Sequence, residues 1–200
     1  MGNQPVVTIF EQYGSGADAV GRKVAEALGV PYHAQAFSSE DLEGADATLE
    51  SNAVLATVYS VMGGAYRGLD GFDVAVTQRE KYDLVMENNR NLQQEAEGGG
   101  VLVGRNATVV LANRPNAIHV LLTGSLEDRV ARAAQEAGIP IDKALKRQQR
   151  EDEVRAEMSK TLYGWDPRLP DRYDLVINTS RVPVDAAASA IVSALRAIVG

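Results

Sequence analysis

Residues 5–29, PVVTIFEQYGSGADAVGRKVAEALG, decide the fold, because an apolar run, a glycine turn and a helical pattern follow one another there. The apolar run is mostly β-branched, which predicts a buried strand that ends in the turn. After the turn, Val20, Val24 and Leu28 lie four residues apart, as on one face of a helix, and Gly29 stands where a left-handed helix stop is expected. The stretch therefore predicts a strand, a turn and a helix.

The same alternation continues along the chain. Short apolar runs predict further strands over residues 101–103, 117–123 and 173–178. Helical patterns lie over residues 74–97, 107–112, 142–162 and 183–199, and a further helix begins at Ser125, its cap, and ends at Gly138. Neither a repeat nor a linker is visible, so we predict one α/β domain with a parallel sheet covered on both faces.

Composition excludes several classes of protein. The 200 residues carry 20 Lys and Arg against 27 Asp and Glu, and this net charge of −7 disfavours binding to nucleic acid. The lack of cysteine excludes disulfides and thiolate chemistry, and with only His33 and His119 we predict no metal-binding residues. We expect His119 to be a hydrogen-bonded core residue. No apolar run approaches the ~20 residues of a membrane helix, so a cytoplasmic protein is expected.

The glycine turn at residues 13–16 is a candidate phosphate site. Ligands of open parallel sheets bind at the carboxyl ends of the strands, and the N–H groups of a glycine turn and a helix N-terminus suit an anion. A regular Walker loop would continue with Gly-Lys-Ser/Thr, whereas this chain has Ala17-Asp18-Ala19. Because Gly-Ser-Gly also occurs in plain strand-to-helix turns, the turn alone supports a phosphate site and a structural role equally.

Four segments, taken in order, carry a family resemblance. They are residues 7–32 (VTIFEQYGSGADAVGRKVAEALGVPY), residues 100–107 (GVLVGRNA), residues 119–130 (HVLLTGSLEDRV) and residues 172–180 (RYDLVINTS). In this order they resemble the cytidylate kinase-like family, a branch of the P-loop nucleoside monophosphate kinases.

The resemblance implies a P-loop NTPase-like fold, a three-layer α/β/α arrangement with a parallel sheet and a helical lid. It implies a single nucleotide-kinase-like domain over residues 1–200, with an acceptor-side helical region at about 37–97 and a lid at about 142–166. The implied activity is transfer of the γ-phosphoryl group of ATP to a nucleoside monophosphate or another small acceptor, with ATP and Mg²⁺ as cofactors.

The resemblance also implies site residues. The nucleotide would bind at the phosphate loop, residues Tyr13, Gly14, Ser15, Gly16, Ala17, Asp18 and Ala19. The lid would supply the catalytic side chains Arg147, Arg150, Asp152 and Arg155. A helix with this mixture of charges is more often a solvated face with weak ion pairs, and the charge pattern alone favours that interpretation. The family order of the segments reverses the preference.

Arg105 and Asp18 each allow two roles. Arg105 directly follows an apolar strand, where a guanidinium needs an anionic partner. It is therefore a substrate-binding candidate or the partner of a structural ion pair with an acidic side chain, such as Asp174 or Glu11. Asp18 is a helix-dipole partner, a helix cap or a magnesium contact, and we favour the cap.

The chain departs from the family pattern at charged positions. Ala17 and Asp18 stand where relatives carry Lys or Arg, and Ala34 and Ala36 replace carboxylates. These changes remove charge compensation that phosphoryl transfer needs, unless a cation such as Arg22, Lys23 or a lid arginine replaces it. The alternative hypothesis is therefore a catalytically inactive kinase-fold protein that acts as a nucleotide-sensing or protein-binding subunit.

Several large side chains also leave two interpretations open. Tyr82, Val85 and Met86 fit the apolar face of a helix, where a core position is favoured over a homodimer contact. Tyr163 and Trp165 stand near the end of the predicted lid. Packing against the lid loop is favoured for them over stacking on a base.

Overall fold

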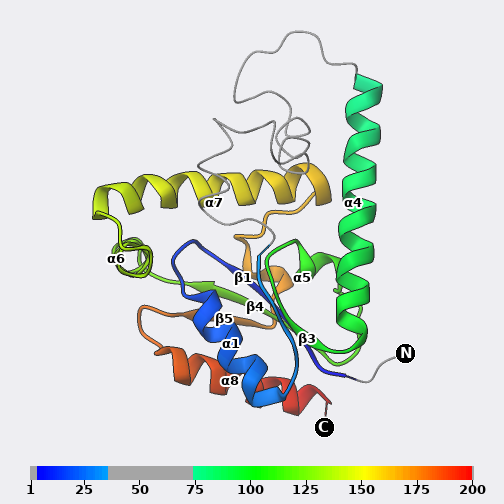
Figure 1. Cartoon of the computed structure of the whole chain (residues 1–200). Helices are drawn as coiled ribbons and strands as arrows, with labels where there is room; N and C mark the ends of the chain where they lie inside the picture. The colour runs from blue at the N-terminus through cyan, green and yellow to red at the C-terminus, as the bar shows by residue number, and fades with distance from the viewer. Residues whose placement is uncertain (1–3, 36–73, 200) are drawn as a thin grey trace.

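The computed structural model describes residues 4–35 and 74–199, and for residues 74–81 only the course of the backbone. A five-stranded parallel sheet has the order β2-β3-β1-β4-β5 (Figure 1). Its strands are β1 (Val6–Glu11), β2 (Tyr32–His33), β3 (Gly100–Val103), β4 (Ala117–Thr123) and β5 (Leu175–Asn178). β1 is central and pairs with both β3 and β4, so the loop that follows it leaves from the middle of the sheet's carboxyl edge.

Helices cover both faces of the sheet, which confirms the three-layer α/β/α prediction. The helices are α1 (Ala17–Leu28), α4 (Val74–Glu97), α5 (Ala107–Val110), α6 (Leu126–Ala137), α7 (Ile141–Tyr163) and α8 (Val184–Val199), with a 3₁₀ turn at Pro170–Arg172. Neighbouring residues of β1 point to opposite faces: Val7 packs in one core with α1 and α8, and Val6 in another with α4 and α5. In Figure 1, α7 runs across the view above the sheet.

Local sequence signals predicted most element ends. Gly29 ends α1 with φ 66°, and the Ser125 side chain accepts a hydrogen bond from the N–H of Asp128 at the start of α6. His119 is a core residue, as predicted, and its Nδ1 lies 2.8 Å from the Thr8 hydroxyl. The two-residue strand β2 was not predicted, because the extended exit forced by Pro31 carries too short a pattern to identify a strand.

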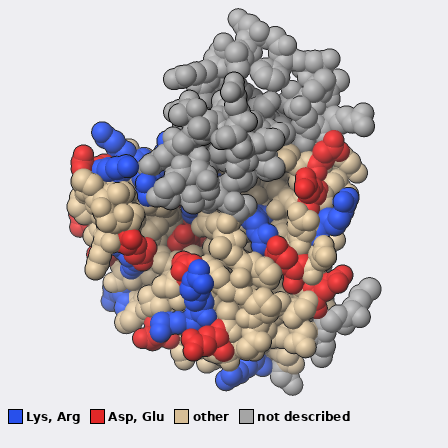
Figure 2. All heavy atoms as spheres, in the orientation of Figure 1, with Lys and Arg blue, Asp and Glu red and all other residues tan. Residues whose placement is uncertain are grey.

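The predicted core position of α4 side chains is wrong for two residues. Tyr82 and Met86 are 63% and 41% exposed, and the homodimer contact stays a prediction. The expectations for residues 36–73, Ala36 included, lie outside the described residues. Within residues 4–35 and 74–199, no helix is long and apolar enough to span a membrane. On the face seen in Figure 2, acidic and basic side chains are interspersed and form no single basic patch.

Candidate active site

The turn between β1 and α1 depends on glycine. Gly14 and Gly16 have φ of 81° and 80°, in the left-handed region that L side chains rarely adopt. A Cβ on Gly14 would lie 2.3 Å from the main-chain oxygen of Arg129, so glycine is what lets the loop approach α6 this closely. Ser15 is buried, and its hydroxyl has no hydrogen-bond partner among the described residues.

Two arginines of α6 hold the carbonyl groups of this loop. Arg129 donates from Nη1 to the oxygen of Tyr13 at 2.9 Å, and Arg132 donates from Nη1 to the oxygen of Gly14 at 2.6 Å. Neither residue was predicted from the sequence to belong to the site. Their spacing of three on an amphipathic helix, directly after a sheet strand, is the signal that places both on one face.

Asp152 ties the lid helix α7 to the same loop. Its Oδ1 accepts the N–H of Tyr13 at 2.7 Å, and its Oδ2 accepts from Arg129 at 2.9 Å and from Gln148 at 2.7 Å. The Asp152 and Arg129 side chains are 21% and 8% exposed. Asp152 is therefore an anchor between lid and loop in this structure, and its catalytic role stays a prediction.

A cavity of about 570 Å³, here called the loop cavity, opens beside the turn. Its described lining brings together the predicted phosphate loop, α6 and one lid arginine. These residues are Glu11, Tyr13, Gly14, Gly16, Ala17, Asp18, Ala19, Ala133, Glu136, Ala137 and Arg147. The structure thus brings Arg147 to the loop, whereas Arg150 is not among the described residues that line the cavity. The catalytic roles of both arginines stay predictions.

Carboxylates outnumber cations in the described lining of the loop cavity, where Glu11, Asp18 and Glu136 face Arg147. Burial raises the pKa of Glu136, although Arg132 acts in the opposite direction. This lining suits a bare polyphosphate poorly, because its three carboxylates repel the negative charges of the phosphates.

The favoured role of Asp18 as a helix cap is wrong. Gly16 occupies the N-cap position of α1, where no side chain caps the helix, and Asp18 lies inside the first turn. Its Oδ2 accepts from Arg22 Nε at 2.8 Å and its Oδ1 from the Tyr32 hydroxyl at 2.9 Å. Arg22 and Lys23, considered as replacement cations, form exposed ion pairs with Asp18 and Asp185.

Glu11, at the end of β1, reaches the helix N-terminus that a phosphate would use. Its Oε2 accepts the N–H of Ala17 at 3.0 Å, while its Oε1 accepts from Gln35 at 3.1 Å and lies 3.6 Å from Arg155 Nη1. Burial raises the pKa of the Glu11 carboxyl, although Arg155 and the Ala17 N–H act in the opposite direction. From the sequence, Glu11 was expected only as a possible ion-pair partner of Arg105.

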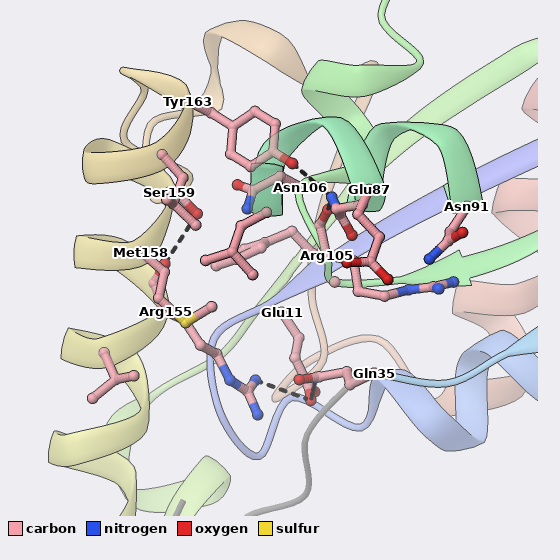
Figure 3. A pocket seen from close by; sticks show the side chains of 16 residues that line it. Glu11, Gln35, Glu87, Asn91, Arg105, Asn106, Arg155, Met158, Ser159 and Tyr163 are labelled. Carbon is pink, nitrogen blue, oxygen red and sulfur yellow. Dashed lines mark hydrogen bonds and ion pairs between the residues drawn. The ribbon is translucent and has the colours of Figure 1, made fainter. Parts of the chain in front are cut away.

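A second cavity of about 310 Å³, here called the side cavity, lies between α4, α7 and the turn after β3 (Figure 3). Its described lining combines amide, charged and apolar side chains. These residues are Phe10, Glu11, Gln35, Leu84, Glu87, Asn88, Asn91, Gly104, Arg105, Asn106, Val154, Arg155, Met158, Ser159, Leu162 and Tyr163. Arg150 is absent from this described lining as well.

Both arginines of the side cavity face carboxylates. Arg105 binds Glu95 through two hydrogen bonds of 3.0 and 2.5 Å, and Arg155 Nη2 donates to Glu151 at 2.7 Å. The ion pair expected for Arg105 therefore exists, but its partner is neither Asp174 nor Glu11. The substrate-binding role of Arg105 stays a prediction that its place in the cavity lining allows.

The two aromatic residues at the end of the lid have different surroundings. Trp165 is buried and its Nε1 donates to Asn106 at 2.9 Å, which agrees with packing against the loop. Tyr163 lines the side cavity, and its hydroxyl accepts from Asn88 at 2.6 Å and donates to Asn89 at 3.1 Å.

The described residues do not form a metal site. In the part of the chain that the structure describes, no three His, Cys, Asp or Glu side chains gather around one point. Asp18, the candidate magnesium contact, is hydrogen-bonded to Arg22 and Tyr32. The described residues therefore offer no cluster of three such ligands. Because Mg²⁺ in kinase sites is usually held by one or two carboxylates together with the substrate phosphates, the magnesium contact at Asp18 stays a prediction.

Solved structures share this fold. An uncharacterized protein from Eubacterium ventriosum superposes with a TM-score of 0.67 at 21% identity, covering 97% of this chain and 99% of that one. A gluconokinase from Sinorhizobium meliloti superposes with a TM-score of 0.53 at 16% identity, covering 100% and 95%. At these identities the likeness shows a kinase-type fold alone.

Sequence comparisons identify the family. A cytidylate kinase from Methanopyrus kandleri is 30% identical over 138 residues, covering 64% of this chain and 72% of that protein. A uronate isomerase from Corynebacterium glutamicum is 34% identical over 96 residues, 48% of this chain, but the match spans only 18% of that enzyme. The model of the cytidylate kinase-like family matches residues 6–181. The chain therefore belongs to the cytidylate kinase-like family.

Proposed function

We propose that this chain transfers the γ-phosphoryl group of ATP to a nucleoside monophosphate or another small acceptor. The phosphates of ATP would lie in the loop cavity and the acceptor in the side cavity. The observation that carries the proposal is that Arg147 of α7 lines the same cavity as residues 13, 14 and 16–19 of the loop. Phosphoryl transfer depends mainly on positioning and on cations near the transferred group, and a lid arginine beside a glycine loop supplies both.

Family membership and the fold support ATP as the donor. Any magnesium ion would arrive bound to the phosphates of ATP, as is usual for Mg²⁺ in kinase sites. A cytoplasmic location belongs to the same proposal, as does a small-molecule acceptor in place of nucleic acid.

Titration calorimetry with ATP and Mg²⁺ tests the proposal. We expect Arg147→Ala to weaken ATP binding by roughly ten- to a hundredfold, the loss typical of a charge-assisted hydrogen bond. Lys146→Ala removes an exposed cation from the adjacent position and should bind ATP as the wild type does. Equal affinities in Arg147→Ala and the wild type would contradict the proposal. Arg150→Ala tests the remaining lid prediction in the same assay.

The second candidate is a catalytically inactive kinase-fold protein that senses a nucleotide or binds a protein. It is favoured by the Glu11 carboxylate on the N–H of Ala17 and by the excess of carboxylates in the described lining of the loop cavity. Transfer of labelled phosphate from ATP to any small acceptor, lost in Arg147→Ala, would eliminate it.

A further inference from the structure

Glu11 stands where the two cavities adjoin. Among the described residues it alone lines both, with one carboxylate oxygen on the start of α1 and the other toward Gln35 and Arg155 (Figure 3). If the donor occupies the loop cavity and the acceptor the side cavity, the reacting oxygen must pass beside this carboxylate. This step of the argument rests on the proposed function.

The charges around the side cavity do not favour a phosphate as the acceptor group. Each arginine of its described lining is already paired, Arg105 with Glu95 and Arg155 with Glu151. Glu11 and Glu87 add two further carboxylates to the lining. A phosphate monoester carries about −1.5 to −2 charges at pH 7, so it would have to displace an existing partner and approach Glu11 as a like charge.

The neutral polar groups of the side cavity suit hydroxyl groups instead. The four amide side chains that line it are Gln35, Asn88, Asn91 and Asn106. Three of them already form hydrogen bonds within the protein, to Glu11, to Tyr163 and from Trp165. An amide carries two donor hydrogens and an acceptor oxygen, so these bonds do not use up its capacity. Apolar side chains of α7, such as Met158 and Leu162, line it as well. The described lining thus resembles a site for an uncharged, polyhydroxylated molecule.

We propose that the acceptor group is an uncharged alcohol, and that the Glu11 carboxylate receives its proton. The alcohol oxygen forms a bond to the γ-phosphorus of ATP, and the bond from that phosphorus to the bridging oxygen breaks with its electron pair going to ADP. The alcohol proton passes to Glu11 and is later released to water. A phosphate acceptor is already ionised and needs no such group. Burial, which raises the pKa of Glu11, makes the carboxylate a stronger proton acceptor.

Calorimetry with matched ligand pairs tests this proposal without turnover. The probes are cytidine and CMP, adenosine and AMP, and ribose and ribose 5-phosphate, each pair differing only by a phosphate. We expect at least one neutral member to bind the wild type about tenfold or more tighter than its phosphorylated partner. Glu11→Gln should reduce that preference about tenfold, because it removes the negative charge and keeps the shape.

Two control variants keep the test sharp. Glu26→Gln removes an exposed carboxylate from α1 and should keep the preference. Glu11→Asp keeps the negative charge and should therefore also keep the preference for the neutral ligand. This second variant keeps the test valid if Glu11→Gln fails to fold. Tighter binding of the phosphorylated members, the same preference in Glu11→Gln, or no binding of any neutral probe would each overturn the proposal.

Kinetics separate this proposal from the proposed function. Where an alcohol is phosphorylated, Glu11→Gln should lower kcat about a hundredfold or more with little change in KM. Phosphorylation of CMP or AMP alone would overturn the alcohol proposal and leave the proposed function intact. Failure to bind ATP would instead remove the proposed function itself.

Discussion

The loop cavity and the side cavity use arginine in different ways. At the loop cavity, Arg129 and Arg132 hold main-chain oxygens of the loop, so they set its shape, and Arg129 also pairs with Asp152. Arg147 is the cation of the described lining. At the side cavity, Arg105 and Arg155 lie in the wall but face carboxylates. The number of arginines near a site therefore does not measure the affinity of that site for anions. What matters is which groups these arginines already neutralise.

The largest expected change in stability tests the contacts of Asp152, which join α7 to the loop beside the loop cavity. Asp152→Ala would leave the Arg129 guanidinium, 8% exposed, without its carboxylate, and the N–H of Tyr13 without its acceptor. Removing one partner of such a pair typically costs about 3 kcal/mol or more of unfolding free energy. Urea unfolding followed by circular dichroism measures it.

Asp142→Ala, at an exposed position in the first turn of the same helix, is the matched control and should cost less than about 1 kcal/mol. If Asp152→Ala costs no more than Asp142→Ala, the attachment of lid to loop is not a stabilising contact. Arg129 and Asp152 would then not be what fixes the shape of the loop cavity.

The fold was predictable because its signals are local. The apolar run of β1, the left-handed Gly29 and the Ser125 cap each act within a few residues of where they stand. The contacts of Asp152 differ in kind, since they join α7 to residues 139 and 23 positions away in the chain. Nothing in the local pattern of a charged helix distinguishes such an anchor from a solvated side chain.

A second, smaller effect tests whether the loop cavity owes its shape to glycine. Gly14→Ala adds left-handed strain, and its Cβ would lie 2.3 Å from the oxygen of Arg129. We expect a loss of about 2 kcal/mol or more, together with weaker ATP binding. Gly138→Ala carries similar strain at φ 63° with no heavy atom within 4 Å of the added Cβ, so about 1 kcal/mol is expected there. Equal losses in thermal unfolding would show that strain alone matters at Gly14.

The candidate site was predictable only in part, for a geometrical reason. Helical spacing puts Arg147 and Arg150 on nearby faces, but only the packing of α7 against the loop brings Arg147 into a cavity. Arg105 was placed correctly at a strand end, whereas its partner Glu95 comes from α4, ten residues earlier. Glu11 was overlooked because a single carboxylate at a strand end has no motif. Glu11 becomes a candidate site residue only because it lines both the loop cavity and the side cavity.

The smallest expected effect is a change in ATP affinity, which tests whether negative charge in the loop cavity weakens nucleotide binding. Asp18→Asn keeps an acceptor for Tyr32 and removes one negative charge from an exposed ion pair with Arg22. We expect a stability change below about 1 kcal/mol and a two- to fivefold gain in ATP affinity that disappears in roughly 0.5 M salt.

Asp185→Asn breaks the comparable exposed pair with Lys23 away from the described cavity lining, and should leave ATP affinity unchanged. If ATP affinity falls in Asp18→Asn but not in Asp185→Asn, the Asp18 carboxylate does not oppose the nucleotide. The carboxylate would then help to hold the nucleotide, as the magnesium-contact interpretation of Asp18 requires, and the excess of acids in the loop cavity would favour a metal–nucleotide complex.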